Sequence, residues 1–254
     1  MKTIVRNSAG VALVFPVTIA LLAGCGHRSP RPEASASGTP AATATPNPTT
    51  SGSTTAGSAS APGPSTASTP GTRVIASLVA YQWRWPNNAD KPGLVPHAAA
   101  VPVPELVRIN VGSHPGEPGQ PPFDRMSFTF TNAFPSYRFA FTDQLTGDPS
   151  GQVIPVKGLG ILRIVFTGAQ AHAADGTRST IISQPVRDIG YRRMVDYALG
   201  GDFEGVLTYG IGINWPIPKS NPQIPVRAYE IQTVMASGQH RYVVAIDINS
   251  ANGG

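Results

Sequence analysis

The sequence is poor in cysteine and in charged residues, and both shortages narrow the kind of protein that it encodes. Cys25 is the only cysteine among 254 residues, so the chain forms no internal disulfide and its fold depends on a hydrophobic core. Charged residues make up 13% of the chain, compared with about 25% in typical soluble proteins. The net charge of +5 is not gathered into a basic stripe, which argues against a nucleic-acid partner.

Motifs of common catalytic and metal sites are also missing. The sequence contains no Gly-x-Ser-x-Gly, Ser-x-x-Lys, His-Glu-x-x-His or Gly-x-Gly-x-x-Gly pattern. His114 and Glu117 are three residues apart, as are His172 and Asp175, but such a pair needs further ligands nearby to hold zinc. We therefore expect no catalytic residue, no metal site and no cofactor.

The N-terminal region has the layout of a secretory signal. Lys2 and Arg6 precede an apolar run that Pro16 interrupts and that is shorter than the ~20 residues of a membrane-spanning helix. The run ends at Leu22-Ala23-Gly24-Cys25, which resembles a bacterial lipobox, where the leader is removed and the cysteine is acylated. We expect a signal peptide over residues 1–24 and lipidation of the cysteine. The alternative is an ordinary cleaved signal followed by a free thiol.

A lipidated Cys25 would place the protein at the cell membrane, facing the extracytoplasmic side. Two or more acyl chains are what stable membrane anchoring requires. The leader contains two basic residues and no acid, so the mature chain keeps 17 basic and 14 acidic residues, a net charge of +3. This weak basic bias is compatible with anionic lipid or wall polymer as a partner.

Residues 25–72 form a predicted tether. Residues 26–71 consist almost wholly of Ser, Thr, Ala, Gly and Pro, which bury too little apolar surface to offset the entropy of ordering. A flexible coil of this length spans roughly 40 Å, and full polyproline extension would approach about 140 Å. Such a composition suits a bare spacer or an O-glycosylated stalk, and the sequence leaves both open.

Residues 73–254 predict one all-β domain. After an opening segment (73–104) that we read as irregular, apolar and polar residues alternate with the period of two that is typical of half-buried strands. The predicted strands are 107–111, 123–131, 137–141, 161–166, 191–198, 206–213, 226–234 and 241–248, with a short helical turn at 169–175. About eight short strands separated by turns favour a single antiparallel β-sandwich or a partly closed barrel.

Two aromatic residues stand out in the opening segment. Trp83 and Trp85 are two residues apart, so on a regular strand both would point to the same side. Our preferred interpretation is that they cover one side of the core. The alternative is an exposed aromatic platform for sugar rings or for a lipid interface.

The predicted strand 206–213 has one nearly bare face. Its apolar face carries Leu207, Tyr209, Ile211 and Ile213, whereas Thr208, Gly210 and Gly212 make up the other face. Glycine inside a strand marks a bend, a bulge or the close approach of another group. We favour tight packing of another segment there. The functional alternative is a flat groove for an extended polymer or peptide, flanked by Trp215.

Asp202 and Glu204 precede this strand and are two residues apart. Paired carboxylates are the catalytic groups of glycoside hydrolases. Acidic residues at strand ends more often accept backbone hydrogen bonds or pair with an arginine, for which Arg125 and Arg163 are candidates. We favour this structural role and keep Asp202, Glu204, Gly210, Gly212 and Trp215 together as the candidate binding surface.

Three motifs resemble the AMIN-like domain of actinobacterial envelope lipoproteins. They are residues 104–112 (PELVRINVG) followed by 123–125 (FDR), residues 134–139 (FPSYRF) and residues 201–213 (GDFEGVLTYGIGI), and the resemblance extends over about 101–248. It implies a β-sandwich related to domains that place envelope proteins near peptidoglycan, and it brings no catalytic residues. The leading hypothesis is a non-catalytic lipoprotein that binds peptidoglycan, another wall glycan or an envelope protein. The alternatives are a glycan hydrolase that uses Asp202 and Glu204, and a carrier of an apolar ligand.

Overall fold

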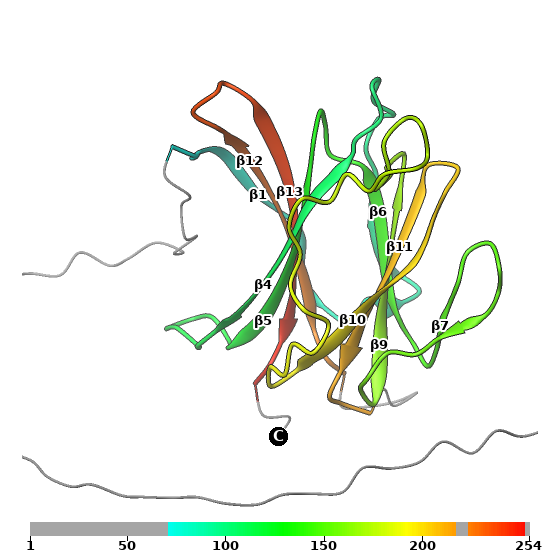
Figure 1. Cartoon of the computed structure of the whole chain (residues 1–254). Helices are drawn as coiled ribbons and strands as arrows, with labels where there is room; N and C mark the ends of the chain where they lie inside the picture. Colours follow the sequence, from blue (N-terminus) through cyan, green and yellow to red (C-terminus); the bar gives the residue numbers. More distant parts are fainter. Residues whose placement is uncertain (1–70, 217–222, 252–254) are drawn as a thin grey trace, which may run out of the picture. The chain divides into compact units, whose positions relative to one another are not determined.

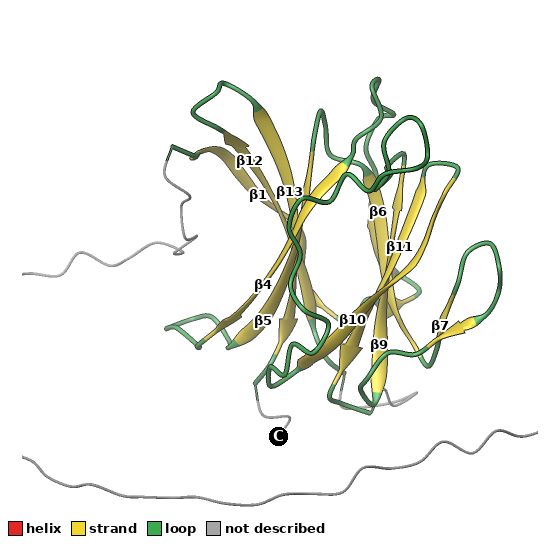
Figure 2. Cartoon of the chain, viewed as in Figure 1, coloured by secondary structure: helices red, strands yellow, loops and turns green. Residues whose placement is uncertain are grey.

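The computed structural model describes residues 71–216 and 223–251, and this part of the chain is an all-β sandwich. Leu22, Ala23, Gly24, Cys25 and nearly all of the predicted tether lie outside the described residues. Two antiparallel sheets face each other, as Figure 1 shows along the chain and Figure 2 by secondary structure. Within the described ranges we find no helix with the length and hydrophobicity of a membrane span.

One sheet has five strands, and every neighbouring pair in it is antiparallel. Its order is β1 (Arg73–Arg84), β12 (Val226–Val234), β13 (His240–Asn249), β5 (Phe123–Phe130) and β4 (Leu106–His114). The longest strand, β1, therefore lies at one edge and has only β12 as a neighbour in this sheet.

The second sheet has six strands and is likewise antiparallel. Its order is β10 (Met194–Phe203), β11 (Val206–Ile213), β9 (Gly160–Thr167), β6 (Ser136–Thr142), β3 (Lys91–Val95) and β2 (Asn87–Asn88). A small hairpin of β7 (Leu145–Thr146) and β8 (Val153–Ile154) forms a separate two-stranded sheet.

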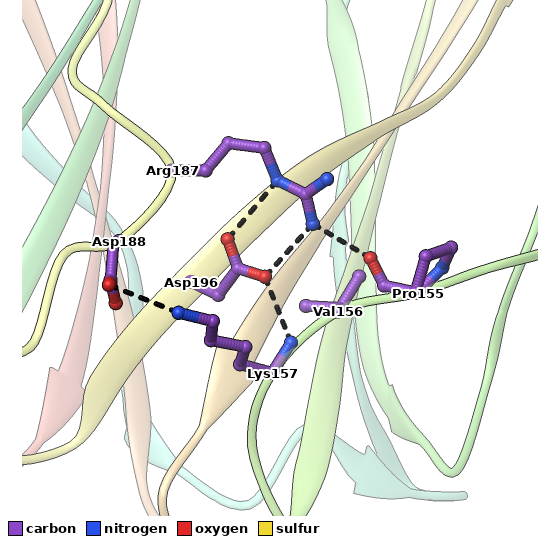
Figure 3. A pocket seen from close by; sticks show the side chains of 6 residues that line it. All are labelled: Pro155, Val156, Lys157, Arg187, Asp188 and Asp196. Carbon is purple, nitrogen blue, oxygen red and sulfur yellow. Dashed lines mark hydrogen bonds and ion pairs between the residues drawn. The ribbon is translucent and has the colours of Figure 1, made fainter. Parts of the chain in front are cut away.

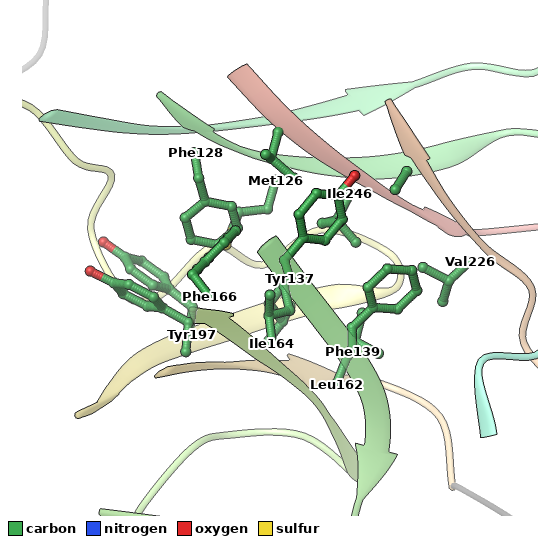
Figure 4. Packing of buried hydrophobic residues seen from close by; sticks show 14 of the residues in the cluster. Met126, Phe128, Tyr137, Phe139, Leu162, Ile164, Phe166, Tyr197, Val226 and Ile246 are labelled. Carbon is green, nitrogen blue, oxygen red and sulfur yellow. The ribbon is translucent and has the colours of Figure 1, made fainter. Parts of the chain in front are cut away.

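The core between the two sheets is filled with large apolar side chains. Along β5 every second residue is buried, including Met126, Phe128 and Phe130, and this confirms the alternation seen in the sequence. Phe128 meets Phe166 of the opposite sheet edge-on, with ring centroids 5.0 Å apart (Figure 4). Tyr137 is also completely buried in this layer. Around these residues, the chain's own side chains fill the space between the sheets, where an apolar ligand would have to lie.

All eight predicted strands exist, and two of them, 206–213 and 226–234, have the predicted bounds. The strand predicted at 191–198 instead runs from Met194 to Phe203. The amide of Tyr191 donates to the carbonyl of Met194, so the chain turns at the predicted start and straightens only afterwards.

Two other predictions about local structure are wrong. Residues 73–84, which we read as irregular, form the 12-residue strand β1, and its first six residues are exposed, so alternating burial gives no signal there. Residues 169–175 form no helical turn. The amide of Ala173 donates to the carbonyl of Arg178, and His172 makes an antiparallel bridge with Ser179, so this segment doubles back as a small hairpin.

Candidate functional site

Asp202, one half of the predicted carboxylate pair, binds a histidine instead of an arginine. Its Oδ2 accepts a hydrogen bond from the backbone amide of Ala171 at 3.0 Å and lies 2.7 Å from Nδ1 of His172. His172 comes from the loop that follows β9, 30 residues earlier in the chain. Oδ1 of Asp202 is buried and has no hydrogen-bond partner among the described residues. The carboxylate thus ties the 168–193 loop to β10.

Glu204, the other half of the pair, lies in the two-residue turn between β10 and β11. Phe203 pairs with Val206, and the two residues between them have positive φ angles, 48° for Glu204 and 73° for Gly205. Positive φ at both central positions is typical of the type I′ hairpin turn. The side chain of Glu204 is exposed, and it makes no hydrogen bond or ion pair with Asp202.

The arginines that we proposed as partners of this pair are engaged elsewhere. Arg125 binds Asp247, and Arg163 binds Asp148 at 2.8 Å. The chain therefore does not assemble Asp202 and Glu204 into a joint carboxylate site.

The glycine face of β11 is covered, so the close packing that we favoured is confirmed and the alternative of an open groove is wrong. A Cβ atom on Gly210 would lie 2.8 Å from a methyl group of Leu145. One on Gly212 would collide with the backbone carbonyl of Lys157. Leu145 is completely buried and packs with Ile161 on this side of the sheet. The segment that contains β7 and β8 therefore lies against β11 because the two glycines leave room for it.

Trp215 does not flank a groove either. Its ring packs against the core, and the guanidinium of Arg193 lies 4.5 Å from the ring centroid. Arg193 also donates to the carbonyls of Asn249 (3.2 Å) and Ala251 (2.9 Å). Trp215 and Arg193 thus fasten the C-terminal segment to the end of the sandwich.

A surface pocket of about 480 Å³ lies beside the covering segment (Figure 3). Arg187 donates to Asp196 at 2.9 Å and to the carbonyl of Pro155 at 2.7 Å, and Lys157 pairs with Asp188 at 3.0 Å. The two cations and two carboxylates that line the pocket neutralise one another. The pocket thus offers a ligand little net charge, and its polar groups are already engaged in fastening the segment to β10.

A stronger candidate lies on the outer face of the five-stranded sheet. Arg227 of β12, Asp247 of β13 and Arg125 of β5 occupy directly opposed positions on adjacent strands. Arg125 donates to Asp247 through Nε (2.6 Å) and Nη2 (2.9 Å), and Arg227 does so through Nε (3.0 Å) and Nη2 (2.8 Å). The side chain of Asp247 is completely buried, although it points away from the core. Two guanidinium groups thus share one carboxylate.

Aromatic rings enclose these two arginines. Arg227 lies 4.3 Å from the centroid of Trp83 and 4.5 Å from that of Tyr229, and Arg125 lies 5.2 Å from that of Phe123. Such cation–π contacts are worth about 0.5–2 kcal/mol each, the larger values applying where water is excluded. We call the following set the outer-face cluster: Trp83, His114, Phe123, Arg125, Arg227, Tyr229 and Asp247.

Trp83 reaches this face because β1 is irregular. The pairing of β1 with β12 shifts between Tyr81 and Arg84, so Trp83 leaves the side on which Tyr81 is buried. Trp85 follows the end of the strand and stacks on Phe141 in the core, with centroids 4.8 Å apart. The prediction that Trp83 and Trp85 share one side is therefore wrong.

His114 extends the aromatic surface to the edge strand β4. It lies opposite Phe123 and stacks on it, with centroids 4.5 Å apart and an angle of 15° between the ring planes. Burial lowers the pKa of His114, and the nearby Arg125 lowers it further. The ring is therefore uncharged at neutral pH, and the outer-face cluster carries a net charge of +1 from its two arginines and one carboxylate.

The sequence contained a partial signal for this cluster that our prediction missed. Arg125 and Arg227 each alternate with core residues on a correctly predicted strand, so both were identifiable as outward-facing. Their convergence on Asp247 depends on the order of the strands in the sheet, which alternation does not reveal. Among residues 71–216 and 223–251, no group of three or more His, Cys, Asp or Glu side chains is placed to hold a metal ion.

Comparison with known families gave one match. A family model described as the AMIN-like domain matches residues 104–241, slightly more than half of the chain. The matched range begins just before β4 and ends within β13, so β1 lies outside it. Neither the curated proteins nor the solved structures contain a match to the chain.

Proposed function

Because the chain belongs to the AMIN-like domain family, we propose that it is a non-catalytic extracytoplasmic protein that binds cell-wall glycan, with peptidoglycan as its ligand. The family match over residues 104–241 is the observation that carries this proposal. The net positive charge of the chain supports it, because wall polymers and peptide stems bear carboxylates.

The proposal includes a lipid anchor at Cys25. It is supported by the sequence Leu22-Ala23-Gly24-Cys25 behind a basic and apolar leader, and by the Ser/Thr/Ala/Pro-rich stretch that follows. Anchored in this way, the sandwich would reach wall polymer at a distance from the membrane that residues 25–72 set. Intact-mass analysis of the membrane-extracted protein tests the anchor. We expect a mature N-terminus at Cys25 carrying acyl chains, and a Cys25→Ala variant should lose both the acyl mass and the membrane association.

A binding role agrees with the structural positions of Asp202 and Glu204, the predicted carboxylate pair. Asp202 is committed to His172 and Ala171, and Glu204 occupies a tight turn. The hydrolase alternative predicts that Asp202→Asn or Glu204→Gln abolishes release of soluble fragments from peptidoglycan. We expect neither the wild type nor these variants to release fragments.

Co-sedimentation with purified peptidoglycan sacculi tests the proposed function directly. The full chain, extracted in detergent, should pellet with sacculi in a saturable manner, whereas an unrelated β-sandwich protein of similar net charge should stay in the supernatant. Retention no greater than that of this control would overturn glycan binding. Capture of an envelope protein by the same chain would then favour the scaffolding alternative.

A further inference from the structure

We propose that the outer-face cluster is the binding site for wall glycan, and that it selects a carboxylate-bearing strand by combining a stacking surface with a shared pair of arginines. This inference rests on the proposed function and specifies where, and by what chemistry, the glycan is bound. Four properties of the cluster carry it: the arrangement of its rings, its unbalanced charge, its available hydrogen-bond donor and its location in the fold.

The rings form a continuous apolar surface across the sheet. The centroids of Trp83 and Phe123 are 6.1 Å apart, and those of Phe123 and His114 are 4.5 Å apart, so the surface extends from β1 to the opposite edge strand β4. All three side chains are partly exposed. An aromatic face is electron-rich and attracts the C–H groups on the flat face of a pyranose ring. An extended polymer suits a surface of this shape better than a compact ligand does.

The charge of the cluster is unbalanced in a place where water is largely excluded. Arg227 and Arg125 share Asp247, so one positive charge has no counter-charge within the cluster. The side chains of Arg227 and Arg125 are only 6% and 15% exposed, and a low local dielectric strengthens their attraction for an anion. The neighbouring Asp124 forms no ion pair with either arginine among the described residues; its carboxylate accepts hydrogen bonds from Ser113 and from the amide of Arg193.

The cluster also has one arginine nitrogen, Nη1 of Arg125, that forms no hydrogen bond among the described residues. Arg227 uses Nη1 to bind the side-chain oxygen of Gln120 at 2.6 Å, and the same oxygen lies 3.5 Å from the indole nitrogen of Trp83. For Arg125, both hydrogen bonds to Asp247 involve Nε and Nη2, and no hydrogen bond within the described part of the chain involves Nη1. A carboxylate at the surface would find Nη1 of Arg125 available beside the ring of Phe123.

Among the described residues, the glycine that can be compared on this face, Gly112, has no backbone segment packed against it. On the six-stranded sheet, Leu145 and the Lys157 backbone lie against Gly210 and Gly212. On the five-stranded sheet, Gly112 lies opposite Arg125, and a Cβ atom added there would meet only the ring of His114, at 3.2 Å. The space over this part of the sheet is thus bordered by side chains of the outer-face cluster.

Two variants separate the two parts of the site. Trp83→Ala removes a stacking surface, so it should weaken binding of the full chain both to neutral N-acetylglucosamine oligomers and to carboxylate-bearing peptidoglycan fragments, by about tenfold or more. Arg125→Gln removes the available donor while Arg227 still pairs with Asp247. It should weaken binding of the carboxylate-bearing fragments by a similar factor and leave the neutral oligomers nearly unaffected.

Matched controls lie elsewhere on the described domain. Phe203→Ala removes an aromatic side chain that is 49% exposed on β10, and Arg178→Gln removes an exposed arginine from the loop after β9. Both should bind like the wild type. Titration calorimetry gives the affinities, and the thermal unfolding midpoint of each variant shows whether it is folded. His114→Ala, which removes the ring at the other end of the stacking surface, provides a second stacking test if Trp83→Ala is unfolded, and it should weaken the binding of both kinds of ligand.

The outcomes distinguish the site from the function. If the wild type binds sacculi and folded Trp83→Ala binds equally well, the proposed site is wrong and the proposed function stands. If Arg125→Gln weakens the binding of neutral and charged fragments equally, the charge selection is wrong. If the wild type itself does not bind sacculi, the proposed function fails, and this inference fails with it.

Discussion

The six-stranded sheet hides part of its outer face under a segment of its own chain, whereas in the described part of the five-stranded sheet the outer-face cluster is enclosed by side chains. Gly210 and Gly212 let Leu145 and the Lys157 backbone approach β11, so that strand is buried on both faces. On the other sheet, Arg125 and Arg227 are enclosed by rings and share Asp247. A ligand cannot reach the outer face of β11, because a segment of the chain packs against it. On the five-stranded sheet, partly exposed aromatic rings beside the arginines leave a surface that a ligand can contact.

Removal of the shared carboxylate should have the largest effect on stability. Asp247→Ala would leave two poorly hydrated guanidinium groups close together without a counter-charge. Losing one partner of a buried ion pair costs about 3–5 kcal/mol. Urea denaturation should show a loss of this size in the free energy of unfolding. A loss below about 1 kcal/mol would show that the rings, and not Asp247, hold the arginines in place.

A methyl group added to each face should distinguish the covered face from the open one. In Gly212→Ala the new Cβ meets the Lys157 carbonyl, so the covering segment has to move, and overpacking of this kind costs about 1–3 kcal/mol.

The matched change on the five-stranded sheet is Gly112→Ala, whose Cβ would meet only the movable ring of His114. It should cost less than about 1 kcal/mol. Thermal or urea unfolding of both variants measures the difference, and equal losses would contradict the contrast between the two faces.

The two sheets also offer similar ion pairs that differ in burial. Asp148 accepts hydrogen bonds from Arg163 at 2.8 Å and from Thr208 at 3.0 Å, but the side chains of Asp148 and Arg163 are 42% and 31% exposed. Solvent screening limits such pairs, so Asp148→Ala should cost only about 1 kcal/mol. Urea denaturation measures the loss in the free energy of unfolding. If Asp148→Ala lost as much as Asp247→Ala, burial would not explain the difference in strength between the two ion pairs.

The smallest expected effect is a pH dependence that originates in His114. Burial and the nearby Arg125 hold its pKa below the ordinary value, so the unfolded chain takes up a proton first as the pH falls. The contribution of His114 to stability should therefore decrease as the pH falls below about 6.5. Thermal unfolding between pH 7 and pH 5 should show a smaller loss for His114→Gln than for the wild type. An equal loss would assign the pH dependence to other groups.

The sequence was sufficient to predict the core strands because their alternation is local. Strand 206–213 was predicted with correct bounds, and Gly210 and Gly212 correctly indicated close packing. β1 was missed because its edge position leaves half of it exposed and a bulge disrupts its period. Alternation of apolar and polar residues thus predicts a strand that has one buried face, and it does not predict an exposed strand at the edge of a sheet.

The functional side chains were harder to predict because they come together across the sheet. Asp202 and His172 are 30 residues apart, and Arg125 and Asp247 are 122 residues apart. The candidate pair Asp202 and Glu204 was close in sequence, yet Asp202 binds His172 and Glu204 is an exposed residue of the hairpin turn. Strand order, which decides which residues become neighbours, is the information that a single sequence did not supply.

The position of β1 determines how the domain would bear mechanical load. This strand starts at Arg73, directly after the stretch that leads from Cys25, and Trp83 lies near its far end. With the chain fixed to the membrane at one end and to the wall through Trp83, tension would run along β1. The covalent backbone of β1 would carry the part of the load that enters at Trp83, and the β1–β12 hydrogen bonds would be sheared only by the part that enters at Arg227 of β12.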